Sequence, residues 1–261
     1  MAEIHGNVFT LWLSNVPVVV LQGFQAVKEG LTAHAEHFIM VPGVMFSNGH
    51  LWKQQRHFGL ATMRKMGVGK KDQEYQIQKE ACHLVEYFQK MNEKVQKEMD
   101  DVLGCSHLIC YEDRKKLPYT NAVIHEIQRY SNIVLIALPR QSMKDTELLG
   151  FPVPKNTIIL SNIDSVLSDP GKWETPDEFN PGHFLDKDGN FVNRDAFLPF
   201  SIGHRVCMGQ LLARMELFIV FSTLLQAFTF TLPEGVKEVN TKLVFGATMK
   251  PPPYQLCAIP R

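Results

Sequence analysis

The 261-residue chain lacks the features that mark secreted proteins and nucleic-acid-binding proteins. Lys plus Arg number 27 and Asp plus Glu number 27, so no basic excess is present to attract a nucleic acid. The five cysteines are odd in number and form no C-x-x-C pair, and the sequence contains neither an Asn-x-Ser/Thr acceptor nor a secretory signal. These absences favour a reducing, cytosol-facing environment.

Long apolar runs without polar interruption are also absent. The most apolar stretch, residues 211–230, contains Arg214, Glu216 and Gln226, which are all unfavourable in lipid. We therefore expect a helix buried in protein there and no membrane span. Apolar residues make up 45% of the chain and charged residues 21%, as in an ordinary globular protein, and no repeat or linker divides the sequence.

The N-terminal third combines β-rich and helical patterns. Residues 8–13 and 16–21 are β-rich, and the intervening Ser14-Asn15 predicts a hairpin turn. Apolar residues recur at helical spacing over 24–34 and predict a helix. A second helix is expected from about Leu51, after a loop that contains Pro and Gly.

An apolar stripe of unusual length follows at residues 72–103. Its apolar residues recur every three or four positions, with charges elsewhere, and no internal Gly, Pro or cap interrupts them. Globular helices usually run about 8 to 20 residues. The pattern therefore predicts either one long amphipathic helix or a short coiled coil.

The remainder of the chain predicts helices, short strands and an irregular segment. Pro118 suits the first position of a helix that runs to about residue 129, and another helix is expected from just after Cys207 to near Phe230. Residues 169–199 are rich in Pro and Gly and predict irregular structure. Short β-rich segments occur at 133–138, 157–160, 244–245 and 254–259. The expected fold class is mainly α with small β-sheets (α+β).

The most informative motif is Phe-x-x-Gly-x-Arg-x-Cys-x-Gly, from Phe200 to Gly209. Cys207 lies where a helix is expected to begin, and the free N–H groups and partial positive charge of a helix N-terminus favour a thiolate. Arg205 adds a full positive charge. Gly203 permits a tight or bulged backbone, and Gly209 lets a large flat ligand lie against the first helical turn. A lone buried cysteine is the plainer interpretation, but the whole pattern favours the proximal ligand of a haem iron.

This motif closely resembles the haem-binding loop of the cytochrome P450 monooxygenases. The resemblance implies that Cys207 ligates the iron of haem b (iron protoporphyrin IX). Glu126-Ile-Gln-Arg129 resembles the Glu-x-x-Arg helix of the family, in which side chains at i and i+3 share one face. Residues 179–184 resemble the following loop, whose basic residue, here His183, joins that pair. The implied role of this structural triad is folding and haem retention, whereas Glu-x-x-Arg alone would indicate only a surface ion pair.

Four further side chains match the propionate-binding positions of the family. Trp52-Lys-Gln-Gln-Arg56 resembles the Trp-x-x-x-Arg helix, in which one turn separates two donors that suit a haem propionate. Arg140 and Arg205 match the other two positions. Each arginine alone is typical of a solvated charge, but four donors in the family's order favour a propionate site.

The resemblance extends from about Ile4 to Arg261, and the local sequences at 118–129 and 197–201 look like those of the vertebrate family-two members. Those are microsomal enzymes that act on drugs, fatty acids and other apolar molecules. The resemblance implies an NADPH–cytochrome reductase as partner, an apolar small-molecule substrate, and a place on the cytosolic face of the endoplasmic reticulum membrane. The family's N-terminal anchor is absent from this sequence, which leaves a soluble cytoplasmic location as the alternative.

Part of the family's sequence has no counterpart here. Within the long stripe, the part to about Lys90 resembles the helix after Trp-x-x-x-Arg, whereas residues 93–104 resemble a helix just before Glu-x-x-Arg. The distal helix, with its Ala/Gly-Gly-x-Asp/Glu-Thr signature, is not found; Asp145-Thr146 and Glu174-Thr175 have the acid–alcohol pair without the glycines. We therefore expect a single incomplete haem-thiolate domain over 1–261, in two parts (1–91 and 92–261), that lacks the distal central helices and any catalytic acid–alcohol pair.

Three functions remain open. The resemblance implies a haem-thiolate monooxygenase that inserts one oxygen atom from O₂ into apolar substrates. In that case Ile133–Leu138 and Phe245–Met249 would line the substrate site. The basic residues at 64–71 would either dock the reductase or form a solvated charge cluster. The alternative is a catalytically inactive fragment that binds haem or sequesters the reductase. A zinc hydrolase is the third: His125-Glu126 begins an H-E-x-x-H motif, but Arg129 at its end cannot ligate zinc, and Cys105-x-His107-x-x-Cys110 has no fourth ligand.

Overall fold

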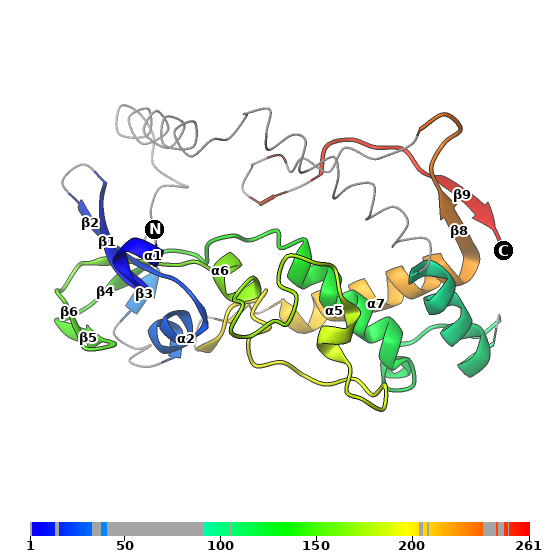
Figure 1. Cartoon of the computed structure of the whole chain (residues 1–261), viewed down its shortest axis with the longest axis horizontal. Helices are drawn as coiled ribbons and strands as arrows, with labels where there is room; N and C mark the ends of the chain where they lie inside the picture. The colour runs from blue at the N-terminus through cyan, green and yellow to red at the C-terminus, as the bar shows by residue number, and fades with distance from the viewer. Residues whose placement is uncertain are drawn as a thin grey trace. The chain divides into compact units, whose positions relative to one another are not determined.

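The structure is a computed structural model that describes residues 2–13, 16–32, 38–40, 91–104, 106–203, 206–207, 209–236, 244, 248–249 and 251–261 (Figure 1). The chain forms two compact units, each assembled from segments that are distant in sequence. The first unit comprises Met1–Tyr75, Val134–Lys172 and Leu198–Cys207. The second comprises Gln76–Ile133, Trp173–Phe197 and Met208–Arg261.

A five-stranded sheet of order β1-β2-β7-β4-β3 forms the centre of the first unit. β1 and β2 pair antiparallel, which confirms the predicted hairpin, and β7 runs parallel to β2. The inner strand β2 is rich in valine, as suits a strand with buried side chains, and its Val18, Val19 and Leu21 are buried. The strands are β1 (Val8–Leu13), β2 (Val16–Leu21), β3 (Phe38–Met40), β4 (Arg140–Ser142) and β7 (Ile158–Ser161).

Helix α2 (Phe24–Thr32) confirms the helix predicted from residue 24, and residues 33–34 of that prediction lie outside the described residues. Its buried face includes Phe24, Val27 and Leu31 at helical spacing. A Cβ at Gly30 would lie only 2.2 Å from a methyl group of Leu21, so glycine lets the helix approach β2 closely.

Three short elements complete the first unit. They are α1 (Ala2–His5), α6 (Asp164–Leu167) and a separate hairpin of β5 (Thr146–Leu148) with β6 (Phe151–Val153). Leu149 and Gly150 form the hairpin turn with φ of 50° and 79°, a left-handed backbone typical of two-residue β-turns. The sequence did not predict this hairpin because leucine is an unusual residue at such a turn.

The second unit packs its helices around one apolar core. Residues 91–102 are helical, and α5 (Pro118–Tyr130) and α7 (Gln210–Ala227) contribute to the same core (Figure 1). The helix predicted at 118–129 is thereby confirmed. The other elements are η2 (Tyr111–Lys115), η3 (Pro181–Phe184), β8 (Phe228–Thr231) and β9 (Cys257–Pro260). The most deeply buried side chains of the core are Met91, Val95, Met99, Leu117, Val123 and Phe218.

One predicted strand and one predicted helix end are wrong. Residues 133–138 form no strand; Ile136 alone bridges to Asn162, because these side chains are largely exposed and Pro139 lacks the N–H that a ladder needs. The helix after Cys207 ends at Ala227, since residues 228–231 pair with the C-terminal strand β9. The predicted irregular segment 169–199 is confirmed except for η3, and β7 confirms the strand predicted at 157–160.

The predicted burial of the helix after Cys207 is also wrong. Only Phe218, Ser222 and Leu225 of α7 are buried, and Leu211 is 64% exposed. Within the described part of the chain, apolar composition therefore did not predict which faces of this helix are covered. Among the described residues, α7 is the helix whose length and composition would allow it to cross a membrane, a property that core helices of soluble proteins share.

Several predictions fall outside the described residues. These are the helix from Leu51, the basic cluster at 64–71 and residues 72–90 of the apolar stripe; the stripe's end at 91–102 is helical as predicted. Helices with small sheets agree with the predicted α+β class. The absence of the distal helices remains a prediction.

Candidate functional site

Two backbone hydrogen bonds join described residues of the loop before Cys207. Ser201 and Gly203 both have a left-handed backbone, with φ of 65° and 81°. The N–H of Cys207 donates to the carbonyl of Phe200 over 3.0 Å, and the N–H of Val206 donates to that of Gly203 over 3.0 Å. Cys207 is an exposed, free cysteine at the end of this loop. The thiol of Cys207 is therefore accessible to a ligand, and the backbone N–H of the same residue is held by the Phe200 carbonyl.

Gly203 packs directly against the C-terminal end of α2. A Cβ at this position would lie 2.3 Å from the carbonyl oxygen of Leu31, too close for any side chain. The same carbonyl accepts a hydrogen bond of 3.2 Å from the guanidinium of Arg140, which is buried. The structure thus brings Gly203 and Arg140, both expected near the haem, to one backbone atom that the sequence did not point to.

The other expected cofactor residues are only partly described. Trp52, Arg56 and Arg205 lie outside the described residues. Gly209 is the N-cap of α7, and its carbonyl accepts the N–H of Ala213 over 2.9 Å. Gly209 stands two residues after Cys207, and α7 begins at the next residue, Gln210, close to where the sequence predicts a helix start.

Glu126, Arg129 and His183 come together as the sequence predicts. Arg129 donates two hydrogen bonds, of 2.8 and 2.7 Å, to the two carboxylate oxygens of Glu126. His183 Nδ1 lies 3.3 Å from each of the same oxygens. Glu126 and Arg129 are one turn apart on α5, and η3 supplies His183. All three side chains are at most 1% exposed, so this is a buried charge cluster and not a surface ion pair.

Backbone groups complete this charge cluster. The N–H of Asn180 donates to Glu126 over 2.8 Å, and Arg129 donates to the carbonyls of Pro176 and Glu178 over 2.8 and 2.7 Å. Buried charges are tolerated when their hydrogen-bonding capacity is satisfied in this way. The cluster therefore joins α5 to the irregular segment 176–183, and motif spacing gave no signal for these backbone partners.

Both acid–alcohol pairs have structural contacts. Thr175 Oγ1 lies 3.0 Å from His183 Nε2, and Glu174 forms an ion pair of 2.9 Å with Arg194. Asp145 accepts the N–H of Lys155 over 2.7 Å in the hairpin region. Through these contacts the two acidic side chains and Thr175 hold neighbouring segments of the chain together.

The residues considered for zinc are linked to one another through Asp113. His107 Nε2 and Cys110 Sγ lie 2.9 and 3.2 Å from the same Asp113 oxygen. Burial disfavours the charged form of Asp113, but hydrogen bonds from Cys110 and His107 outweigh it and hold the pKa well below its usual range. Within the described ranges, no three His, Cys, Asp or Glu side chains gather to hold a metal ion, and Cys105 lies outside those ranges.

Comparison with known proteins identifies the family. The family model described as Cytochrome P450 matches residues 1–94 and 89–258. The chain belongs to the cytochrome P450 family. The two matched stretches meet at residues 89–94, within the region where the sequence predicts a junction between two helices that are distant in other members.

Similar family members are known from fish and mammals. Cytochrome P450 2K6 of Danio rerio is 51% identical over 180 residues, which cover 68% of this chain and 35% of the relative. Cytochrome P450 2D28 of Mesocricetus auratus is 48% identical over 168 residues (64% and 34%), and human cytochrome P450 2D6 is 47% identical over 168 residues (64% and 34%). Each match spans about a third of the relative's own length.

The described residues fit the haem that this family implies. Cys207 offers an exposed thiol, a ligand type that holds haem iron in thiolate-ligated proteins. Arg140 offers a buried guanidinium, which suits a carboxylate such as a propionate. A Cβ at Gly203 would lie only 2.3 Å from the Leu31 carbonyl oxygen, so glycine lets the loop that carries the cysteine pack closely on the end of α2.

Proposed function

We propose that the chain is a haem-thiolate protein of the monooxygenase type, with Cys207 as the iron ligand. The exposed thiol on a hydrogen-bonded loop carries the proposal, and family membership supports it. Haem held by a thiolate supplies the activation of O₂ and the insertion of one oxygen atom into an apolar substrate.

Different residues of the chain would bind the haem propionates, border the iron ligand and stabilise the fold around them. Trp52, Arg56, Arg140 and Arg205 would hold the propionates by charge-assisted hydrogen bonds, while Phe200 and Gly209 border the cysteine in sequence. Glu126, Arg129 and His183 hold α5 against the segment 176–183 and contribute to haem retention through the fold.

A pyridine haemochrome assay on the purified chain tests the iron ligand. Cys207→Ser should abolish haem retention, whereas Cys257→Ser, which removes another exposed and free cysteine, should retain haem. The reduced, carbon-monoxide-bound spectrum should show a strongly red-shifted Soret band in the parent chain and the Cys257 variant. Equal haem content in both variants, with unchanged circular dichroism, would contradict the assignment.

The proposal extends to partners and place in the cell. An NADPH–cytochrome reductase would supply electrons, the substrates would be apolar small molecules such as xenobiotics or fatty acids, and the protein would act at the cytosolic face of the endoplasmic reticulum membrane. Product formation from a lipophilic substrate with reductase and NADPH tests the electron donor and the substrate class. The location at the endoplasmic reticulum membrane is tested by fractionation of cells.

A second candidate is a catalytically inactive form that binds haem or occupies the reductase. The structural contacts of both acid–alcohol pairs favour it, because neither pair then serves proton delivery. In the same assay, reductase binding without substrate-dependent NADPH consumption would support this candidate, and coupled product formation would exclude it.

A further inference from the structure

The buried cluster of Glu126, Arg129 and His183 determines which ring nitrogen of the histidine carries a proton. Arg129 donates to both carboxylate oxygens of Glu126 over 2.8 and 2.7 Å, so the carboxylate is ionised and can only accept hydrogen bonds. His183 Nδ1 lies 3.3 Å from each of these oxygens, and the residue is buried. Nδ1 must therefore donate to Glu126, which requires a proton on that nitrogen.

Thr175 sets the opposite constraint on the other ring nitrogen. Its backbone N–H donates to His183 Nε2 over 3.2 Å. A backbone N–H can only donate, so Nε2 accepts this hydrogen bond with its lone pair and carries no proton. The Thr175 hydroxyl lies 3.0 Å from the same nitrogen. A neutral imidazole has one donor and one acceptor nitrogen and satisfies both partners, whereas an imidazolium would direct a second N–H at the N–H of Thr175.

Asn180 fixes the direction of the hydroxyl hydrogen bond. Its side-chain oxygen accepts from the N–H of Gly182 over 2.9 Å, which distinguishes the amide oxygen from the amide nitrogen. The amide nitrogen then donates to Thr175 Oγ1 over 3.1 Å. Because Oγ1 already accepts from Asn180, its own proton is available for Nε2 of the histidine. The hydrogen bonds therefore run in one direction, from the Asn180 amide through the Thr175 hydroxyl to the ring.

The acidic residue nearest to Nε2 has another partner. Glu174 lies 3.9 Å from Nε2, beyond hydrogen-bond distance, and its side chain is 63% exposed. It forms an ion pair of 2.9 Å with Arg194. The ring of Trp173 packs edge-on against His183 with 5.5 Å between the ring centres, and it carries no charge. Among the contacts of the described residues, Nε2 thus has hydrogen-bond donors within 3.2 Å and no carboxylate.

We propose that Thr175 is a positioning residue that holds the proton of His183 on Nδ1, so that the histidine joins the buried cluster as a neutral donor and not as a cation. The cluster then contains one negative and one positive charge, and no third buried charge requires compensation. This role differs from the basic role that the family resemblance implies for the residue. Its consequence for haem retention rests on the proposed function, whereas the position of the proton does not.

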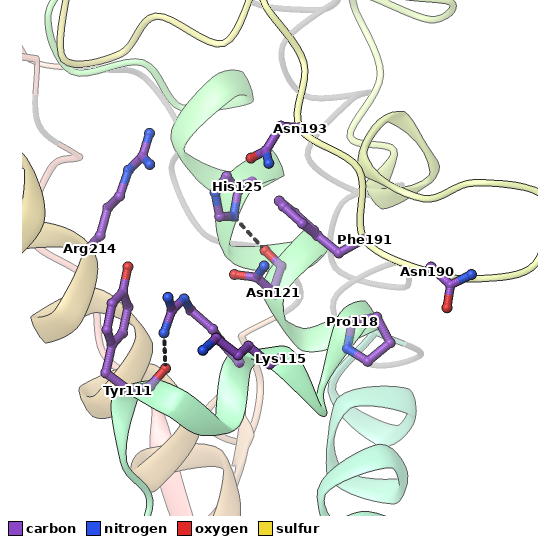
Figure 2. A pocket seen from close by; sticks show the side chains of 10 residues that line it. Tyr111, Lys115, Pro118, Asn121, His125, Asn190, Phe191, Asn193 and Arg214 are labelled. Atoms are coloured by element: carbon purple, nitrogen blue, oxygen red, sulfur yellow. Dashed lines mark hydrogen bonds between the residues drawn. The ribbon is translucent and has the colours of Figure 1, made fainter.

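His125, on the same helix α5, provides an internal reference. Burial lowers its pKa to about 4; the hydrogen bond to Asn121 opposes this effect, and the positive charge of Arg214 adds to it. The ring is therefore neutral at neutral pH. Its Nδ1 lies 2.8 Å from the carbonyl oxygen of Asn121 (Figure 2), and a carbonyl can only accept, so this ring also carries its proton on Nδ1. The two histidines should give the same pattern of ring-nitrogen signals.

Nuclear magnetic resonance of the isotope-labelled chain at neutral pH locates the proton. Nδ1 of His183 should give the signal of a protonated nitrogen and Nε2 that of an unprotonated one, as for His125. Thr175→Val removes the hydroxyl at similar volume and should increase the share of rings with a proton on Nε2, whereas Thr175→Ser keeps the hydroxyl and should give the parental spectrum. Two protonated nitrogens in the parent ring, or a parental spectrum in Thr175→Val, would overturn the proposal.

Two amides at position 183 test the same assignment through stability. Asparagine places its amide nitrogen where Nδ1 lies and can donate to Glu126, whereas glutamine places its amide nearer to the position of Nε2. In urea unfolding, His183→Asn should therefore keep a higher midpoint than His183→Gln, although asparagine fills less of the buried space. Equal midpoints, or a higher midpoint for glutamine, would contradict donation from Nδ1.

Haem content separates this proposal from the proposed function. In the pyridine haemochrome assay, haem per folded chain should be higher in His183→Asn than in His183→Gln. If the parent chain retained no haem while its ring signals and urea midpoints followed the expected pattern, the proposed function would fail and the role of Thr175 would stand.

Discussion

Substitution of Gly203 by alanine should destabilise the chain far more than an alanine at an ordinary turn glycine. The residue has a φ of 81°, and a Cβ there would lie 2.3 Å from the Leu31 oxygen and 3.2 Å from its carbon. A left-handed backbone costs an L-residue about 1–2 kcal/mol. Overpacking against groups that cannot rotate away adds about 1–3 kcal/mol. The expected loss in free energy of unfolding is therefore about 2–5 kcal/mol.

Gly150→Ala is the matched control. Gly150 belongs to the same unit and has a φ of 79°, but a Cβ there would meet nothing within 4 Å. Its substitution therefore reports only the backbone strain. In urea unfolding followed by circular dichroism, Gly203→Ala should lose about 1–3 kcal/mol more than Gly150→Ala. Gly203→Ala should also lower the haem content measured by pyridine haemochrome, because the glycine positions the loop that carries Cys207.

Two results would refute this reasoning. Equal losses for the two variants would show that the contact between Gly203 and the end of α2 has no energetic weight. A large loss of stability with unchanged haem per folded chain would show that the position of the loop does not govern cofactor retention.

Three further substitutions test the buried ionisable groups of the second unit. Glu126→Gln leaves Arg129 buried without its carboxylate and should lower the free energy of unfolding by about 3–5 kcal/mol, so an unchanged urea midpoint would contradict the structure. For His125, the folded pKa of about 4 lies below the ordinary 6.5, so the unfolded chain binds the extra proton between these values. Stability should fall by about 3 kcal/mol as the pH drops from 6.5 to 4, and His125→Phe should flatten this slope in unfolding measured against pH. The pKa of Asp113 is lowered in the folded chain, so its ionised carboxylate contributes to stability above a pH of about 4, and this contribution is lost in stronger acid. Asp113→Asn should remove that acid-dependent loss and should reduce the free energy of unfolding at pH 7 by about 1.5–3 kcal/mol. Thermal unfolding of both chains at pH 7 and in acid measures the two effects.

Local pattern predicted the elements whose partners are near in sequence. The β1–β2 hairpin and α5 match their predictions closely, because alternation, helical spacing and Pro118 act within a few residues. The end of α7 was misjudged because residues 228–231 pair with strand β9, more than twenty residues further along the chain. Nothing in the apolar run itself distinguishes a last helical turn from a strand whose partner comes later.

The candidate site shows the same division. The spacing of Glu126 and Arg129 predicted their contact, since one helical turn joins them. The backbone donors and acceptors that complete the cluster come from residues 176–180, and a carbonyl group has no sequence signature. The charge of His183 could not be predicted for a related reason: the sequence gives the residue type, and the N–H of Thr175 that sets the position of its proton belongs to the backbone.

The haem-loop motif around Gly203 and the Glu-x-x-Arg motif at Glu126 therefore encode different physical constraints. At Gly203 the constraint is steric: φ is positive, and any Cβ would lie 2.3 Å from the Leu31 carbonyl oxygen. At Glu126 the requirement is a charge with complementary donors on all sides, so an isosteric amide fills the space and still leaves Arg129 uncompensated. Steric variants should consequently act on the loop of Cys207, and charge variants on the packing of α5. If both kinds of change reduced haem content only in proportion to global unfolding, the loop would have no separate role in holding the cofactor.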